Sequence, residues 1–292
     1  ILIATANTIN AQWQQANGTA GNEVYSTTTD GTNIYAALNN GILLSTNKGI
    51  SFAAVNVLTG TNLNAFAISG TNVFAGTHDG VYLSTNSGTS WTLANNGMTD
   101  VNITSLAISG TSIFAGTYTG GMYLSTNNGS SWTGVNNGLP NAQITKLAIS
   151  GTNIFAGTPV GVYLSTNNGT SWTAVNNGLT NTQIMSLLIS GTNVYAGTFS
   201  KGVFVSTNNG TSWTSVNFGL PSESPVWSLG ICGKYLFAGT ANGLFSSAND
   251  GALWSSINSG LTNSQIFSIT VIESTIFVST YGDGIWKRPL SE

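Results

Sequence analysis

The sequence predicts an all-β fold, a seven-bladed β-propeller of four-stranded antiparallel blades, and two features of the chain lead to this prediction. The first is a fixed period: five tryptophans recur at intervals of 40 or 41 residues, and Phe52 and Trp13 extend the series toward the N-terminus in steps of 39. A period near 40 residues indicates one structural unit copied and stacked. The second is composition: short runs of β-branched and aromatic residues alternate with Gly, Asn and Thr, which favours strands and turns over helices.

The clearest unit spans residues 144–178 and contains four such runs, within ITKLAIS, GTNIFAGT, PVGVYLSTNNG and TSWTAVNNG. No stretch shows the 3.6-residue apolar period of an amphipathic helix. Four strands in about 40 residues is typical of one propeller blade.

Seven such units fit the chain, which we interpret as a single domain over residues 1–292. Six of them end in an aromatic fourth strand, whereas the seventh reaches the C-terminus after its third strand. The strand around Trp13 has no unit of its own. We therefore expect residues 1–22 to supply the closing strand of the last blade, which would remove an open sheet edge. The blades are expected to begin near Val24, Leu63, Ile103, Ile144, Ile184, Val226 and Ile266.

The turn between the third and fourth strands is nearly constant and reads STNSGTSW at residues 84–91. This turn resembles the Asp-box, S-x-D-x-G-x-[ST]-W, of the BNR propellers, a set that includes sialidases, sortilin-type receptors and photosystem assembly factors. Asn replaces Asp in every copy. An amide oxygen still accepts bonds from turn N–H groups, and the tryptophan would wedge between neighbouring sheets, so we interpret the box as structural. Its residues are Asn47, Asn86, Asn127, Asn167, Asn208, Asn249, Trp91, Trp132, Trp172, Trp213 and Trp254.

Composition limits the partners. Charged residues make up 5% of the chain, with only six Lys and Arg, so binding to nucleic-acid phosphates is not expected. Neutral Asn boxes do not suit calcium, and one His and one Cys do not suit zinc, so no metal or cofactor is expected. Apolar runs are too interrupted for membrane insertion. Cys232 lies in a first-strand run and is predicted to be a buried thiol. We expect a monomer.

The repeated segment STNNGTSW and the ending IWKRPLSE resemble the sequences of secreted Bacteroidota propellers that carry a C-terminal sorting domain. This resemblance implies an extracellular or bacterial cell-surface location. A glycan or an extracellular protein would then be the partner.

The loops between second and third strands differ in every copy, whereas the boxes scarcely change. Divergence on one face is typical of a binding surface, although drift without selection would give the same pattern. Aromatic residues there could stack on sugar rings, and Asp79, Asp100, Glu223 and Asp283 could accept bonds from hydroxyls. The candidate ligand-binding residues are His78, Asp79, Tyr118, Phe199, Lys201, Tyr281 and Asp283.

The favoured function is a non-enzymatic module that recognises glycan or protein through this variable loop face. Sialidases, which belong to the family that the box resembles, bind the substrate carboxylate with three arginines. This chain has only Arg288, so sialidase activity is not expected. A glycoside hydrolase or lyase using Asp79 with His78, or Asp283, is the first alternative; a glycosidase pair would need carboxyls about 5–10 Å apart. A spacer without a ligand is the second.

Overall fold

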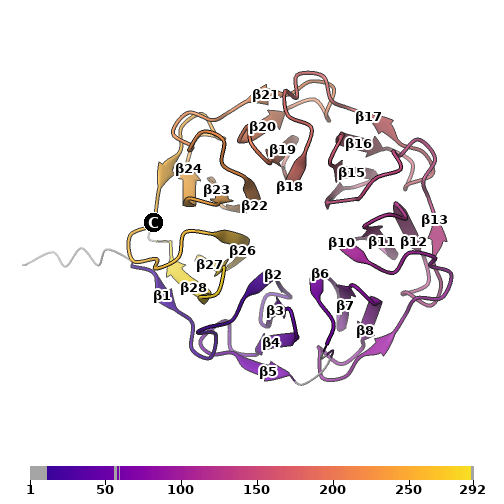
Figure 1. The fold of residues 1–292 in the computed structure, drawn as a ribbon, viewed down its shortest axis with the longest axis horizontal. Coiled ribbons are helices and arrows are strands. Elements are labelled where there is room, and N and C mark those ends of the chain that lie inside the picture. The colour runs from indigo at the N-terminus through magenta and orange to yellow at the C-terminus, as the bar shows by residue number, and fades with distance from the viewer. Residues whose placement is uncertain (1–11, 56–57, 59, 291–292) are drawn as a thin grey trace, which may run out of the picture.

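The computed structural model describes residues 12–55, 58 and 60–290, which form seven four-stranded antiparallel sheets arranged as a ring (Figure 1). The first strand of each blade lies nearest the centre and the fourth lies at the periphery. The predicted fold class is therefore confirmed. No helix that could cross a membrane occurs in this part of the chain.

The strands of blade 1 are β2 (Val24–Thr29), β3 (Ile34–Leu38), β4 (Gly41–Ser45) and β5 (Ala53–Val55); of blade 2, β6 (Leu63–Ser69), β7 (Asn72–Thr77), β8 (Gly80–Ser84) and β9 (Thr92–Leu93); of blade 3, β10 (Ile103–Ser109), β11 (Ser112–Thr117), β12 (Met122–Ser125) and β13 (Thr133–Gly134); of blade 4, β14 (Lys146–Ser150), β15 (Asn153–Thr158), β16 (Gly161–Ser165) and β17 (Thr173–Ala174); of blade 5, β18 (Ile184–Ser190), β19 (Asn193–Thr198), β20 (Val203–Ser206) and β21 (Thr214–Ser215); of blade 6, β22 (Val226–Cys232), β23 (Tyr235–Thr240), β24 (Gly243–Ser247) and β25 (Ser255–Ser256); and of blade 7, β26 (Ile266–Ile272), β27 (Thr275–Thr280), β28 (Gly284–Pro289) and β1 (Gln14–Gln15).

The last blade is closed by the N-terminal strand, as predicted. β1 pairs antiparallel with β28, with Gln14 opposite Lys287 and Gln15 opposite Trp286. The preceding Trp13 is 4% exposed, and its Nε1 donates to the Ile257 carbonyl of blade 6 at 2.7 Å. Ring closure therefore combines strand pairing with a buried indole. The first eleven residues of the predicted 1–22 segment lie outside the described residues.

Second strands form the packed layer between blades. Each carries one aromatic ring that is at most 1% exposed: Tyr35, Phe74, Phe114, Phe155, Tyr195, Phe237 and Phe277. The blades approach so closely that five second strands have Gly two positions after this ring. At Gly116, an added Cβ would lie 2.6 Å from Ile144 Cγ2 of the next blade, inside van der Waals contact. Glycine at this position therefore sets the spacing between blades.

The box turns are held by their own side chains. In blade 4, Asn167 Oδ1 accepts the Ser165 hydroxyl at 2.9 Å and the Ser171 N–H at 3.0 Å, and Asn167 Nδ2 donates to Ser171 Oγ at 2.9 Å. The Gly169 N–H donates to Ser165 Oγ at 2.8 Å. An amide both accepts and donates here, which gives a physical reason for Asn in place of Asp.

Four of the five box tryptophans have the same burial and the same kind of indole hydrogen bond. The indoles of Trp132, Trp172, Trp213 and Trp254 are at most 5% exposed and donate to carbonyls of the preceding blade at 2.7–2.8 Å. Trp91 differs, because it is half-buried and donates to Gly88 in its own turn at 3.0 Å.

Cys232 is half-buried, so the prediction of a buried thiol is wrong. It is the last residue of β22, opposite Tyr235 beside the hairpin turn, where the strand reaches the surface of the ring. Its Sγ lies 3.6 Å from the Glu273 carbonyl oxygen.

Candidate functional site

The second-to-third-strand loops lie beside the segments that precede the first strands. In four blades, the backbone N–H of the first loop residue donates to the carbonyl of the residue directly before the first strand, at 2.9–3.2 Å. Antiparallel alternation places these loops on the face opposite the boxes. We call the four loop residues the rim residues: His78, Tyr118, Phe199 and Tyr281. All three predicted aromatics thus occupy equivalent positions, and they are 45–54% exposed.

Inside the rim, a β-bulge turns one residue out of register in six of the seven first strands. In blade 3, Ile103 pairs with Thr117 and Ser105 pairs with Gly116, which leaves Thr104 without an opposite residue. A bulge of this kind redirects a side chain. The residues skipped in this way are Tyr25, Asn64, Thr104, Met185, Trp227 and Phe267. In blade 4, Thr145 occupies this place before β14, and its N–H donates to the Gly157 carbonyl at 2.8 Å.

The bulge residues surround the central opening of the ring, and they differ in chemistry between its two sides. On blades 2 to 4 they are polar and bind the next blade: Asn64 Nδ2 donates to the Ile103 carbonyl at 2.8 Å, and Thr145 Oγ1 donates to the Ile184 carbonyl at 2.7 Å. On blades 6, 7 and 1 they are aromatic. We call this group, together with the rim residue Tyr281, the aromatic wall.

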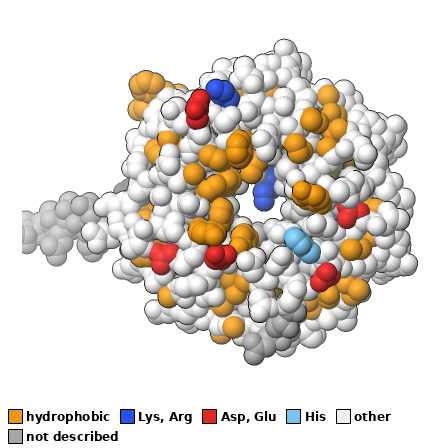
Figure 2. All heavy atoms as spheres, viewed as in Figure 1, with side chains coloured by type: hydrophobic (Ala, Val, Ile, Leu, Met, Phe, Trp, Pro, Cys, Tyr) orange, Lys and Arg blue, Asp and Glu red, His pale blue; other side chains and the backbone are white. Residues whose placement is uncertain are grey.

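Ring contacts hold the aromatic wall together. The Phe267 ring lies 4.8 Å from Trp227, 5.8 Å from Tyr25 in a stacked arrangement, and 5.9 Å from Tyr281 edge to face. The Tyr25 hydroxyl donates to Glu23 at 2.5 Å; burial and this bond raise its pKa, so it remains neutral. Hydrophobic side chains gather along one side of the opening in Figure 2, with the single histidine on the other.

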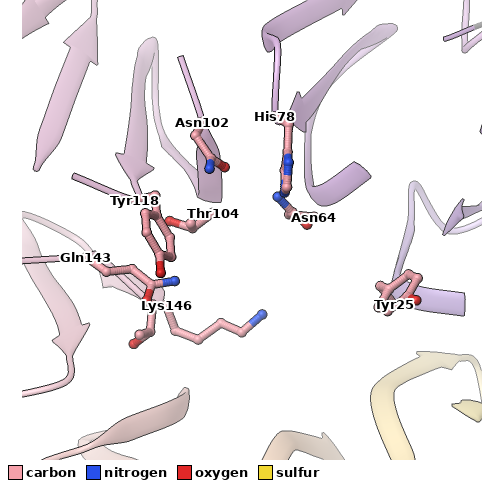
Figure 3. A pocket seen from close by; sticks show the side chains of 9 residues that line it. Tyr25, Asn64, His78, Asn102, Thr104, Tyr118, Gln143 and Lys146 are labelled. Atoms are coloured by element: carbon pink, nitrogen blue, oxygen red, sulfur yellow. The ribbon is translucent and has the colours of Figure 1, made fainter. Parts of the chain in front are cut away.

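A pocket of about 520 Å³ occupies the polar side of the opening (Figure 3). Amide, hydroxyl and aromatic groups line it, together with one histidine and one lysine, and no lining residue is acidic. The lining residues are Tyr25, Asn64, His78, Asn102, Thr104, Tyr118, Gln143, Thr145 and Lys146. Such a surface offers hydrogen bonds in many directions and two tyrosine faces.

Lys146 is the basic group of this pocket, and its side chain extends into the opening (Figure 3). It is half-buried, and burial lowers its pKa from the ordinary value of 10.5. Among the described residues, no carboxylate lies within ion-pair distance of it; the ion pair that they contain joins Lys48 and Glu273. The ammonium group thus faces the opening without a counter-charge.

The remaining predicted site residues lie elsewhere. Asp79 is exposed beside His78. Lys201 lines a smaller pocket of about 340 Å³ with Glu223. Asp283 lies in the loop between β27 and β28, and its carboxylate accepts bonds from Thr262 and, at 3.2 Å, from Gln15 Nε2 of the closing strand β1.

Asp100 is used by the loop itself rather than left open for a ligand. Its carboxylate accepts the N–H groups of Asn102, Thr119 and Gly120 at 2.6–3.0 Å and the Thr119 hydroxyl at 2.9 Å. Burial alone would raise the pKa of Asp100, but these bonds outweigh it and lower the pKa. Asp100 therefore positions the loop that carries Tyr118.

Sequence reasoning missed Lys146, Tyr25, Trp227 and Phe267. The signal for Lys146 was present, because the register aligns it with a small residue in each other blade: Ser26, Ala65, Ser105, Ser186, Ser228 and Ser268. Within the described chain, no three His, Cys, Asp or Glu side chains gather as metal ligands would.

No protein-family model and no curated protein matches the chain. Solved structures do share its fold. The extracellular domain of BT4673 from B. thetaiotaomicron, described as a one-component system, has a TM-score of 0.81 at 20% identity, over 96% of this chain and 40% of that one. YCF48 bound to D1 peptide has a TM-score of 0.76 at 13% identity, over 96% and 97%. The GH74 enzyme of Niastella koreensis has a TM-score of 0.70 at 22% identity, over 93% and 43%.

The chain thus spans about 40% of the length of the BT4673 extracellular domain. At these identities the likenesses show a common propeller fold. These propellers differ widely in role, so the role of this chain has to be argued from its own site.

Proposed function

We propose that the chain is an extracellular, non-catalytic binding module that recognises a glycan at the centre of its loop face. The observation that carries the proposal is the pairing of a pocket lined by amides and hydroxyls with exposed and half-buried aromatic rings. Sugars present hydroxyls at their edges and apolar C–H faces above and below the ring, so both kinds of surface are matched. Each contact contributes about 1 kcal/mol, so affinity would require several of them together.

The wider setting is part of the same proposal. Similarity to an extracellular domain supports a location outside the cell. The Asn-boxes support kinship with the Asp-box propellers and with secreted Bacteroidota propellers. A protein partner is the second candidate, favoured by the likeness to YCF48, a propeller that was solved with a bound peptide.

Catalysis is the less favoured alternative. The carboxylate of Asp283 accepts bonds from Thr262 and Gln15, and that of Asp100 is bonded within its own loop. Of the two carboxylates predicted for a glycosidase, Asp79 and Asp283, only Asp79 is exposed; it lies beside His78. A two-carboxylate glycosidase needs a second free carboxyl at a fixed separation, and no lining residue of the central pocket provides one.

A glycan array probed with the purified chain tests the proposal. Hits should weaken at least tenfold in Tyr118→Ala and in Tyr281→Ala. Phe218→Ala is the matched control, because Phe218 is 76% exposed and follows the peripheral strand β21. Equal binding by all variants would place the ligand elsewhere. Release of reducing sugar that disappears in Asp79→Asn would replace the proposal with an enzyme.

A further inference from the structure

Lys146 is a residue of the loop face that the fold does not require. Six blades place Ser or Ala in the same register and form the same first strand, so a lysine here is not needed for packing. Its ammonium group loses hydration by burial and gains no carboxylate partner among the described residues. A half-buried charge without a partner is unfavourable, which suggests that its partner comes from outside the chain.

The side chains around Lys146 indicate which class of ligand the pocket could bind. Asn64, Asn102 and Gln143 bring side-chain amides, and Thr104 brings a hydroxyl, while no acidic residue lines the pocket. Glu23, the acid bonded to Tyr25 of the aromatic wall, also accepts a bond from Asn39 Nδ2 at 3.3 Å. The pocket therefore favours a ligand with a negative charge and several hydroxyls.

The number of cations sets an upper limit on the ligand charge. Lys146 is the one cationic residue in the pocket, and the whole chain has six Lys and Arg. A polyphosphate or a nucleic acid needs several cations along its path. A single carboxylate needs one, and it can take charge-assisted hydrogen bonds from a lysine ammonium.

We infer that the opening binds an acidic glycan, with the carboxylate of one uronic-acid residue paired with Lys146 and a neighbouring sugar face on Tyr118 or on the aromatic wall. This inference rests on the proposed glycan-binding function and specifies its ligand class. The amides at Asn64 and Gln143 would bond the hydroxyls of the same sugar. Neutral glycans would use the aromatic contacts alone and would leave the lysine without a partner.

The test compares each acid with its own uncharged form. Trimers of galacturonate, mannuronate and guluronate are titrated into the chain by calorimetry, each beside its methyl ester. We expect at least one acid to bind tenfold or more tightly than its ester. Lys146→Ser should remove that difference, and it should fold because Ser stands at this position in five other blades. Lys234→Ser, which removes an exposed lysine in the hairpin turn between β22 and β23, is the matched control.

The outcomes separate this inference from the function beneath it. Equal affinity for acid and ester, or an unchanged acid affinity in Lys146→Ser, overturns the inference and leaves a neutral-glycan module standing. Loss of acid binding in Lys234→Ser as well would indicate general charge attraction and also overturns it. If acids, esters and the glycan array all give no binding, the proposed function itself fails, and the inference with it.

Discussion

Removing the Trp13 side chain should weaken the whole ring rather than loosen one end of the chain. The indole packs in a buried cluster with Phe237 and Leu244 of blade 6 and Trp286 of blade 7. Trp172 in blade 4 has the same 4% exposure, and their bonds to the preceding blade are 2.7 and 2.8 Å long. We therefore expect Trp13→Ala and Trp172→Ala to lower the free energy of unfolding by similar amounts.

The size of the loss follows from burial. A buried tryptophan removes about 150–250 Å² from water, worth about 4–6 kcal/mol at about 25 cal/mol per Å². Truncating buried Trp costs about 3–5 kcal/mol, and a carbonyl deprived of its donor, here that of Ile257, adds about 1 kcal/mol. The expected loss is about 4–6 kcal/mol, out of a total of about 5–15 kcal/mol. Such a loss should lower Tm by about 10 °C.

Urea unfolding followed by near-ultraviolet circular dichroism measures the effect. Trp91→Ala gives a graded comparison, because Trp91 is half-buried and bonds within its own turn, and its loss should be smaller. The reasoning is refuted if Trp13→Ala costs less than about 1 kcal/mol while Trp172→Ala costs the full amount. The closing strand would then be peripheral to the stability of the ring.

Three further predictions concern the centre of the ring. Because burial lowers the pKa of Lys146 in the folded state, the folded chain loses this proton at a lower pH than the unfolded chain. Stability should therefore rise with pH between the lowered pKa and 10.5. Lys146→Ser should remove this rise, measured as Tm from pH 7 to 10.5. Asp100→Ala should cost about 1–3 kcal/mol and weaken any ligand that uses Tyr118. Because the pKa of Asp100 is below 3.8, its stabilisation should be present above that pH and fade in acid unfolding as pH falls through the lowered value, whereas Asp100→Ala should show no such loss. Gly116→Ala should lower stability by about 1–3 kcal/mol, measured in urea, because its Cβ would meet Ile144; an unchanged midpoint would contradict this.

The ring could be predicted from the sequence because its determinants repeat. Tryptophan spacing, the box turns and the unpaired strand at Trp13 each lie in a short segment, and seven copies reinforce one another. The rim residues Tyr118, Phe199 and Tyr281 were found in the same way, by comparing loops.

The inner surface of the ring could not be predicted by alternation. A strand of strict period two places every second side chain on one face. The bulge after Ile103, Val226 and Ile266 breaks that period, so Trp227 and Phe267 face the opening although they read as ordinary strand residues. Asp100 was misread for a related reason: its partners, 19 and 20 positions away, come together only when the hairpin forms.

The pairing of β1 with β28 has a consequence for how the chain acquires its structure during synthesis. The ribosome delivers β1 first and β28 last, and Gln15 bonds to Asp283, 268 positions along the chain. Until β28 emerges, the nascent ring has an unpartnered strand, β1, and an incomplete seventh sheet with an open edge. Contacts of such sequence separation form slowly, so the last step of ring folding, and the period of greatest exposure to aggregation, should be the pairing of β1 with β28.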